Sequence, residues 1–318
     1  MITDNKIIFH YENIKEKKPI TADIFLTNYC NNKCKYCSYN RWDLSKNNKS
    51  MSLEEFKRNY EILKRMGVKG IILTGGGEPS VCKDFDKITE WLEEQNINYG
   101  INTNFNILKY IKPIFLKISL DGYDRESYKN TRGVDTYDIV LSNLKKYIDW
   151  KKNNNVKTQI VLQCMSDSVQ TVEKFYNSIK KYDVQSIVFR PIESTCGSYY
   201  NDENELDKAK QISEYINNLK KSDSRVCLNY KFSYLKSIFS ECYANSLQIA
   251  LNENSEVVYC CHKPYEIIGH ITDENILEKK NNFKTNISLC DVPCRLSGPN
   301  KCFIKLSELE KSIDINFI

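Results

Sequence analysis

Short apolar runs alternate with amphipathic stretches between residues 20 and 192, and this alternation constrains the fold more than any other feature of the sequence. Six runs have the length and composition of buried strands, and the segments between them have the spacing of helices with one apolar face. A repeated strand–helix order predicts a parallel sheet with right-handed crossovers. Six repeats fit an α/β core built as a partial, open (β/α)6 barrel. The predicted strands are Ile20–Leu26, Gly70–Thr74, Tyr99–Thr103, Phe115–Leu120, Thr158–Gln163 and Ser186–Arg190.

Helix signals fill the segments between these strands. Ser52 and Glu55 have the spacing of a capping box, and Gly67 is a natural stop for the helix that it starts. Further helices are predicted over about 136–152, 168–181 and 203–219. Beyond residue 230 the pattern changes to short strands separated by turns, and we expect strands at Gln248–Leu251 and Glu256–Cys260.

Three cysteines with C-x3-C-x2-C spacing, Cys30, Cys34 and Cys37, directly follow the first predicted strand. Three thiolates in one loop can bind three corners of a [4Fe–4S] cluster and leave the fourth iron open to a small molecule. Loops after the C-terminal ends of strands carry the chemistry of such barrels, and the triplet lies on one. Zinc is the alternative, but it needs a fourth Cys or His nearby, and His10 and Cys82 are badly placed for that role.

The triplet, with Tyr36 just before its last cysteine, resembles the signature of the radical S-adenosylmethionine (SAM) superfamily. The resemblance implies that the open iron binds the amino and carboxylate groups of SAM, and that one electron from the cluster releases a 5′-deoxyadenosyl radical. The run TGGGEP after the second strand resembles the family's GGE motif, which holds the SAM amino group. For the polar residues further along, the alternative role is a satisfied turn or helix cap. The SAM-binding residues implied are Tyr36, Gly76, Gly77, Glu78, Asn102, Ser119, Asp121 and Arg132.

Six more cysteines follow residue 240. Cys242 and Cys260 flank a predicted hairpin, which brings distant thiols to one end of a small sheet. The tail resembles the SPASM/twitch extension of radical SAM enzymes, which carries auxiliary [4Fe–4S] clusters. It departs from the family pattern at Ser255, five residues before Cys260, where the family usually has glycine. The resemblance implies one auxiliary cluster bound by Cys242, Cys260, Cys290 and Cys294.

Two thiols of the tail, Cys261 and Cys302, remain outside this ligand set. Adjacent residues on a strand point to opposite faces, so one cluster is not expected to use both Cys260 and Cys261. Cys261 is a candidate hydrogen-atom donor that faces the substrate; the alternatives are a cluster ligand and an inert buried thiol. Ordinary core or surface thiols are expected at Cys82, Cys164, Cys196 and Cys227.

Length and composition indicate a cytoplasmic protein. The N-terminus lacks the order of a signal peptide, and no stretch of eighteen apolar residues is present, so no membrane contact is expected. Thirteen cysteines in a chain without an export signal are best explained as reduced, metal-binding thiols. The net charge of +5 comes from scattered lysines, so nucleic-acid binding is not expected. The predicted divisions are a barrel core over 1–192, a connection over 193–229, and a smaller cysteine-rich α+β domain over 230–318.

The leading functional hypothesis is a radical SAM enzyme that removes hydrogen from a small polar substrate of sugar, aminocyclitol or nucleoside type. The outcome would be dehydrogenation, with the auxiliary cluster as electron acceptor, or epimerisation, with a cysteine as hydrogen donor. The competing enzyme class is a maturase of ribosomally made peptides, disfavoured because only about twenty residues precede the first strand. A non-catalytic iron–sulfur or zinc protein that binds RNA or a partner is the weaker alternative. The expected electron donor is of flavodoxin or ferredoxin type.

Overall fold

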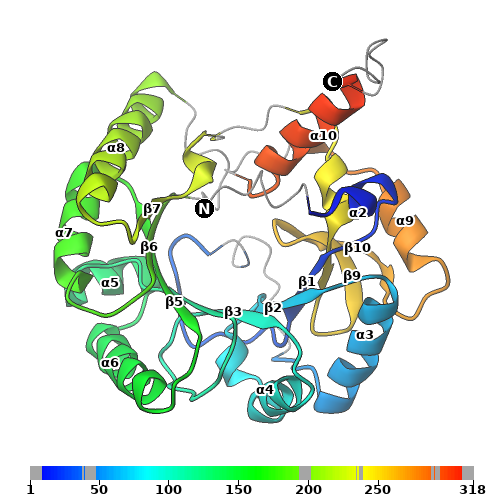
Figure 1. The fold of residues 1–318 in the computed structure, drawn as a ribbon, viewed down its shortest axis with the longest axis horizontal. Coiled ribbons are helices and arrows are strands. Elements are labelled where there is room, and N and C mark those ends of the chain that lie inside the picture. The colour runs from blue at the N-terminus through cyan, green and yellow to red at the C-terminus, as the bar shows by residue number, and fades with distance from the viewer. Residues whose placement is uncertain are drawn as a thin grey trace.

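The computed structural model of the chain describes residues 9–37, 39, 48–192, 202–233, 235, 239–287, 290 and 294–309. In Figure 1 the strands form one curved sheet around a central space, and helices cover its convex, outer side. Among the helices in these ranges, none is long and apolar enough to cross a membrane.

The six predicted strands of the core are all present, with ends that shift by a few residues. They are β1 (Thr21–Phe25), β2 (Gly70–Thr74), β3 (Tyr99–Thr103), β4 (Phe115–Ser119), β5 (Gln159–Ser166) and β6 (Ser186–Pro191). The helices between and after them are α3 (Leu53–Arg65), η2 (Pro79–Val81), α4 (Phe85–Glu94), α5 (Arg125–Arg132), α6 (Tyr137–Asn153), α7 (Val169–Ile179) and α8 (Glu203–Ser222). The capping box is confirmed at α3, where the Ser52 amide donates to the Glu55 carboxylate at 2.8 Å.

The remaining elements are α2 (Tyr11–Lys15), β7 (Val226–Leu228), η3 (Tyr230–Ser233), η4 (Tyr243–Leu247), β8 (Gln248–Leu251), β9 (Glu256–Cys260), β10 (Lys263–His270), α9 (Ile276–Asn282) and α10 (Ser297–Leu309). The strand order across the sheet is β10-β9-β8-β1-β2-β3-β4-β5-β6-β7. The sheet is therefore a partial barrel, as predicted, with a seventh parallel strand, β7, beside β6.

The cysteine-rich tail continues the same sheet. Strand β8 pairs in parallel with β1, and Thr21 lies opposite Gln248. Strands β9 and β10 then add antiparallel neighbours. The tail therefore lies next to the loop that follows β1, although the division of the chain into domains stays a prediction.

Alternate residues on each strand face two different environments. Ala22, Ile24 and Ile118 are fully buried on the outer face, in the main core formed with the helices. Asp23 and Lys117 occupy intervening positions and therefore lie on the concave, inner face. A barrel with polar residues on its inner face is built to surround a polar ligand rather than an apolar core.

Candidate active site

The cysteine loop after β1 is held on one side by the C-terminal end of α5. The Lys33 amide donates to the Arg132 carbonyl at 3.1 Å, and the Lys35 amide donates to the Thr131 carbonyl at 2.9 Å. Gly133 caps α5 with φ of +71°, and a Cβ there would lie 2.1 Å from the Lys33 carbonyl oxygen. Only glycine permits this approach, so the TRG sequence after the helix helps to position the triplet.

The glycine loop after β2 holds the cysteine loop on its other side. The Gly77 amide donates to the Thr27 carbonyl at 2.8 Å, and the Glu78 amide donates to the Tyr29 carbonyl at 2.9 Å. A Cβ on Gly77 would lie 1.8 Å from the Tyr29 carbonyl oxygen, whereas one on Gly76 would meet nothing closer than 3.5 Å. The two motifs named from the sequence are therefore joined backbone to backbone.

Glu78 lies buried at the end of β2, where its carboxylate accepts four hydrogen bonds. Oε1 accepts from the Ser80 amide (3.2 Å), the Ser80 hydroxyl (2.7 Å) and the Thr103 hydroxyl (2.6 Å). Oε2 accepts from the Asn104 amide at 2.7 Å. These bonds fasten the end of β2 to the end of β3, and Oε2 keeps capacity for a further donor. Contact with a SAM amino group stays a prediction for this residue.

Two pairs of asparagines tie the cysteine loop to the segment after β3. Asn104 Nδ2 donates to Asn31 Oδ1 at 2.6 Å, and Asn106 Nδ2 donates to Asn32 Oδ1 at 2.6 Å. Asn31 and Asn32 directly follow Cys30, so these bonds set the path of the triplet. The sequence analysis missed Asn31, Asn32 and Asn106; the repeated asparagines in NN and NTNFN were the available signal.

The chemistry of the triplet fits a cationic iron cluster. Burial, together with charge repulsion from Glu78, Cys34 and Cys37, raises the pKa of the Cys30 thiol to about 12. Thiolates that disfavour one another's charge are stabilised when positive iron lies between them. Among the described residues, no group of three or more His, Cys, Asp or Glu side chains converges on one metal ion. A [4Fe–4S] cluster needs no such convergence, because each thiolate binds a different iron.

Asp121 and Arg132 form a buried ion pair beside the triplet. The Arg132 Nη1 to Asp121 Oδ2 distance is 2.8 Å, and Asp121 Oδ1 accepts from the Met165 amide at 2.8 Å. Burial raises the pKa of Cys34, and the nearby Arg132 guanidinium opposes that rise. In this structure the two predicted SAM contacts therefore bind each other, and their contact with SAM stays a prediction.

Asn102 and Ser119 end neighbouring strands on the inner face, as predicted. Asn102 Nδ2 donates to the Thr74 hydroxyl at 3.0 Å, while its buried Oδ1 has no hydrogen-bond partner among the described residues. That oxygen is an acceptor available to a ligand next to the glycine loop. Tyr36 is half-buried on the cysteine loop, with the Lys35 ammonium 5.3 Å from its ring centroid.

Four thiols of the tail gather beside β9. Burial raises the pKa of Cys242 to about 11, with Cys294 adding to it, and that of Cys290 to about 12, with Cys294 and Cys242 adding to it. Burial also raises the pKa of Cys260, and Cys294 and Cys242 act on it in the same direction. The structure thus brings together the four thiols predicted as auxiliary ligands, and their binding of a cluster stays a prediction.

Ser255 explains the departure from the family pattern. Its φ is +62°, in the left-handed region that favours glycine, and its hydroxyl accepts a hydrogen bond from Asn59 Nδ2 at 2.8 Å. A glycine-type backbone five residues before Cys260 supports the register in which Cys260, and not Cys261, corresponds to the family's cysteine.

Cys261 directly follows β9 and lies near the gathered thiols, since the charge of Cys294 helps to raise its pKa. It packs with Tyr39 against a small apolar cluster of Phe25, Ala250 and Val258, which is separate from the main core. Burial raises the pKa of Cys261 to about 11, so its sulfur carries a proton at neutral pH. Cys261 lies in the turn after β9, so the alternation of adjacent strand residues does not apply to it.

Cations lie close to Cys261 on the inner face. Arg295 forms an ion pair with Asp23 and a hydrogen bond with Gln248. Lys117 lies across the sheet on β4, and burial together with nearby cations, among them Arg295, lowers its pKa to about 7. The sequence analysis singled out neither Lys117 nor Arg295, because isolated basic residues carry no motif.

The remaining thiols lie outside the two predicted ligand sets. Cys82 and Cys164 are buried, and Cys227 is half-buried. Cys302 is half-buried on α10. Cys196 lies outside the described residues.

Comparison with known proteins gives a family for the core. Residues 24–175 match the radical SAM superfamily. A probable GTP 3′,8-cyclase of Pyrococcus abyssi is 33% identical over 137 residues, which cover 41% of this chain and 44% of the relative. The chain thus spans less than half the length of that curated relative.

Solved structures share the fold. SuiB of Streptococcus suis bound to the precursor peptide SuiA has a TM-score of 0.63 at 16% identity, over 97% of this chain and 77% of that one. The protein anSMEcpe with bound AdoMet has a TM-score of 0.60 at 19% identity, over 93% and 87% of the two chains. The match, the cysteine loop and the open barrel agree: residues 24–175 of this chain form a radical SAM domain.

Proposed function

We propose that this chain is a radical SAM enzyme that epimerises or dehydrogenates a small polar substrate held against the inner face of the barrel. Cys30, Cys34 and Cys37 would hold the catalytic [4Fe–4S] cluster, and when bound, the cluster and SAM supply a 5′-deoxyadenosyl radical that removes a hydrogen atom from carbon. Support comes from the family match and from the way two loops and α5 hold the triplet rigidly. The tail thiols Cys242, Cys260, Cys290 and Cys294 would hold one auxiliary [4Fe–4S] cluster.

The residues around the triplet would orient SAM. The glycine loop lets the backbone approach a ligand closely, because Gly76 and Gly77 carry no side chain. Asn102 Oδ1 would accept a hydrogen bond from SAM, since it is buried and has no partner among the described residues. Glu78, Ser119, Asp121, Arg132 and Tyr36 complete the proposed SAM site.

One observation carries the epimerase form of the proposal: Cys261 packs against the apolar cluster of Phe25, Ala250 and Val258 on the inner face. Its S–H group would give a hydrogen atom to the substrate carbon on the face opposite to the one that lost hydrogen. The C–H bond forms as the S–H bond breaks, and the sulfur becomes a thiyl radical. This radical needs one electron and one proton to return to the thiol. A flavodoxin- or ferredoxin-type protein would supply that electron, and water the proton.

The substrate class has two sources of support. The curated relative is named for GTP, which favours the nucleoside type among small polar substrates, and Lys117 and Arg295 suit polar or anionic groups. The peptide-maturase alternative is favoured by the likeness to SuiB, whose structure contains a precursor peptide. Trials with both substrate classes would separate them.

The first experiment is anaerobic reconstitution with iron and sulfide, followed by measurement of 5′-deoxyadenosine under dithionite. Wild type should cleave SAM, and the Cys30/Cys34/Cys37→Ala triple variant should not, while retaining its tail iron. SAM cleavage by the triple variant would overturn the assignment of the catalytic cluster. Absence of cleavage by fully loaded wild type would favour a non-catalytic iron–sulfur protein.

The second experiment tests Cys261 once a substrate is known. In deuterated water, an epimerase should place one solvent deuterium in the product. Cys261→Ala should keep both clusters and form 5′-deoxyadenosine without inverted product. Loss of tail iron would make Cys261 a ligand, and unchanged turnover would make it a bystander.

A further inference from the structure

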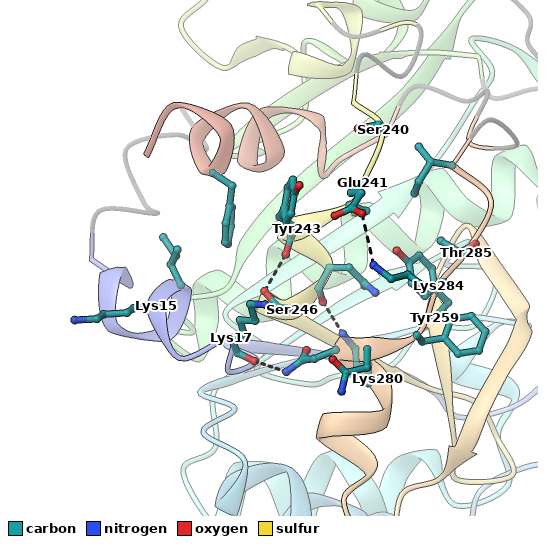
Figure 2. A pocket seen from close by; sticks show the side chains of 18 of the residues that line it. Lys15, Lys17, Ser240, Glu241, Tyr243, Ser246, Tyr259, Lys280, Lys284 and Thr285 are labelled. Atoms are coloured by element: carbon teal, nitrogen blue, oxygen red, sulfur yellow. Dashed lines mark hydrogen bonds and ion pairs between the residues drawn. The ribbon is translucent and has the colours of Figure 1, made fainter. Parts of the chain in front are cut away.

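A cavity of ≈ 490 Å³ lies outside the barrel, where helix α2 meets η4, α9 and α10 (Figure 2). Tyr259 lines it from the outer face of β9, since it alternates with Val258 of the inner cluster. Of the four predicted auxiliary ligands, Cys242 alone is among its described lining residues. The cavity is therefore neither the substrate space of the barrel nor the seat of the auxiliary cluster.

Lys280 supplies a buried ammonium group to this cavity. The residue is 2% exposed, and its Nζ donates to the Asn245 carbonyl oxygen at 2.6 Å (Figure 2). An ammonium has three donors, and no carboxylate of the described residues forms an ion pair with this one, although the nearby thiols of Cys242 and Cys260 favour its charge when they are ionised. A buried cation with incomplete hydrogen bonding is costly, so an anionic oxygen from a ligand would stabilise it.

Two residues that line the cavity carry amide oxygens without a donor among the described residues. Asn281 Nδ2 donates to the Lys17 carbonyl at 3.0 Å, which fixes the orientation of the amide and leaves its buried Oδ1 without a partner in the described structure. Asn245 is 4% exposed, and its Oδ1 likewise lacks a partner there. Buried acceptors of this kind are normally satisfied, so the cavity calls for N–H groups as well as an anion.

The rest of the lining is basic at the rim and apolar on the walls. Lys15, Lys17 and Lys284 are exposed at the rim, where 3.5 Å separates Lys284 Nζ from Glu241 Oε1. The walls are formed by apolar and aromatic side chains. These are Ile14, Tyr259, Phe283, Ile287, Phe303 and Leu306.

We propose that this cavity binds a carboxylate flanked by an N–H group and an apolar side chain, which is the chemistry of a free amino acid or of a peptide's C-terminal residue. The carboxylate would accept from Lys280, the N–H would donate to Asn281 or Asn245, and the side chain would fill the apolar walls. Phosphate fits less well, because its oxygens would face the two amide oxygens and repel them. The proposal does not depend on the reaction in the barrel.

The test measures binding to the reconstituted full-length chain by isothermal titration calorimetry. N-acetyl-leucine should bind saturably, and N-acetyl-leucinamide should bind at least about tenfold more weakly, because it lacks the charge-assisted hydrogen bond to Lys280. Free leucine and a pentapeptide ending in leucine distinguish the two sources of the carboxylate. AMP and inorganic phosphate are the competing anions.

Two variants and one control test the site itself. Lys280→Met should weaken N-acetyl-leucine binding by about tenfold or more. Leu306→Trp should abolish binding by filling the cavity from α10, and it leaves the ammonium in place if Lys280→Met fails to fold. Lys279→Met is the control, since this exposed neighbour pairs with Asp273 at 3.5 Å and does not line the cavity.

Several results would overturn the proposal. They are the absence of saturable binding in the millimolar range, equal binding of the acid and its amide, tighter binding of AMP or phosphate, and wild-type affinity in both variants. Binding by a chain that cleaves no SAM would leave this inference standing and refute the proposed function alone.

Discussion

Replacement of Gly77 by alanine tests whether the glycine loop positions the cysteine triplet. The new Cβ would lie 1.8 Å from the Tyr29 carbonyl oxygen, 2.5 Å from its carbonyl carbon and 2.8 Å from its nitrogen. All three atoms are backbone, so no side-chain rotation relieves the clash. Ordinary contact begins at 3.4 Å, so the two loops must separate by roughly 1.5 Å. Cys30 follows Tyr29 directly and would move with it.

The size of the effect follows from overpacking and lost hydrogen bonds. Inserting a methyl group into a packed site costs about 1–3 kcal/mol. Separation of the loops also strains the bonds from Gly77 to Thr27 and from Glu78 to Tyr29, which contribute about 1 kcal/mol each. We therefore expect Gly77→Ala to lower the free energy of unfolding by about 3 kcal/mol. The neighbouring Gly76→Ala is a matched control, because its Cβ would meet only ordinary contacts from 3.5 Å outward.

The assay combines chemical unfolding with iron analysis, both without SAM, so that neither readout depends on ligand binding. Wild type and Gly76→Ala should hold about eight irons, and Gly77→Ala about four, because only the triplet loses its geometry. If Gly77→Ala keeps full iron and wild-type stability, the glycine loop does not support the triplet as described.

Three further predictions concern the tail thiols, the buried ion pair and Lys117. Alanine at Cys242, Cys260, Cys290 or Cys294 should reduce iron from about eight to about four per chain, whereas Cys261→Ala should retain it; a uniform result for all five would contradict the ligand set. Arg132→Met leaves Asp121 buried and unpaired and should cost about 3–5 kcal/mol in urea unfolding, far more than Arg125→Met at the exposed pair with Asp135. Because burial lowers the pKa of Lys117 to about 7, the folded chain releases a proton that the unfolded chain holds up to its ordinary pKa of 10.5. Unfolding free energy should therefore rise between those pH values by up to about 1.4 kcal/mol per unit, and parallel curves for wild type and Lys117→Met would rule this out.

The sequence predicts the core strands well because buried parallel strands are continuous apolar runs. Strand β7 was not predicted, because Val226–Leu228 is too short to show an apolar run or alternation. Strand β10 was not predicted, because its apolar and polar residues do not alternate. Its pairing with β9 also shifts register twice. Helices α9 and α10 were not predicted, because the cysteine spacing of the tail is a clearer signal than its helical periodicity.

The sequence likewise predicts some features of the candidate site and not others. Cysteine spacing identifies the two groups of thiols, because cluster chemistry restricts which residues can serve. Sequence could not show that Asn31 and Asn104 join two loops, since that contact depends on where distant strands end. Nor could it rank Cys260 against Cys261, which depends on the left-handed backbone at Ser255 and on which face of β9 turns inward.

The pairing of β8 with β1 determines when β1 can gain its native neighbour during translation. Strand β1 leaves the ribosome early, but its partner on one side begins only at Gln248, so that edge has no native neighbour while most of the chain is made. An uncovered apolar strand is a site for association with other chains. A fragment that stops before residue 240 would keep this edge exposed permanently and should aggregate. Strand β1 therefore reaches its final environment only after translation has passed Leu251.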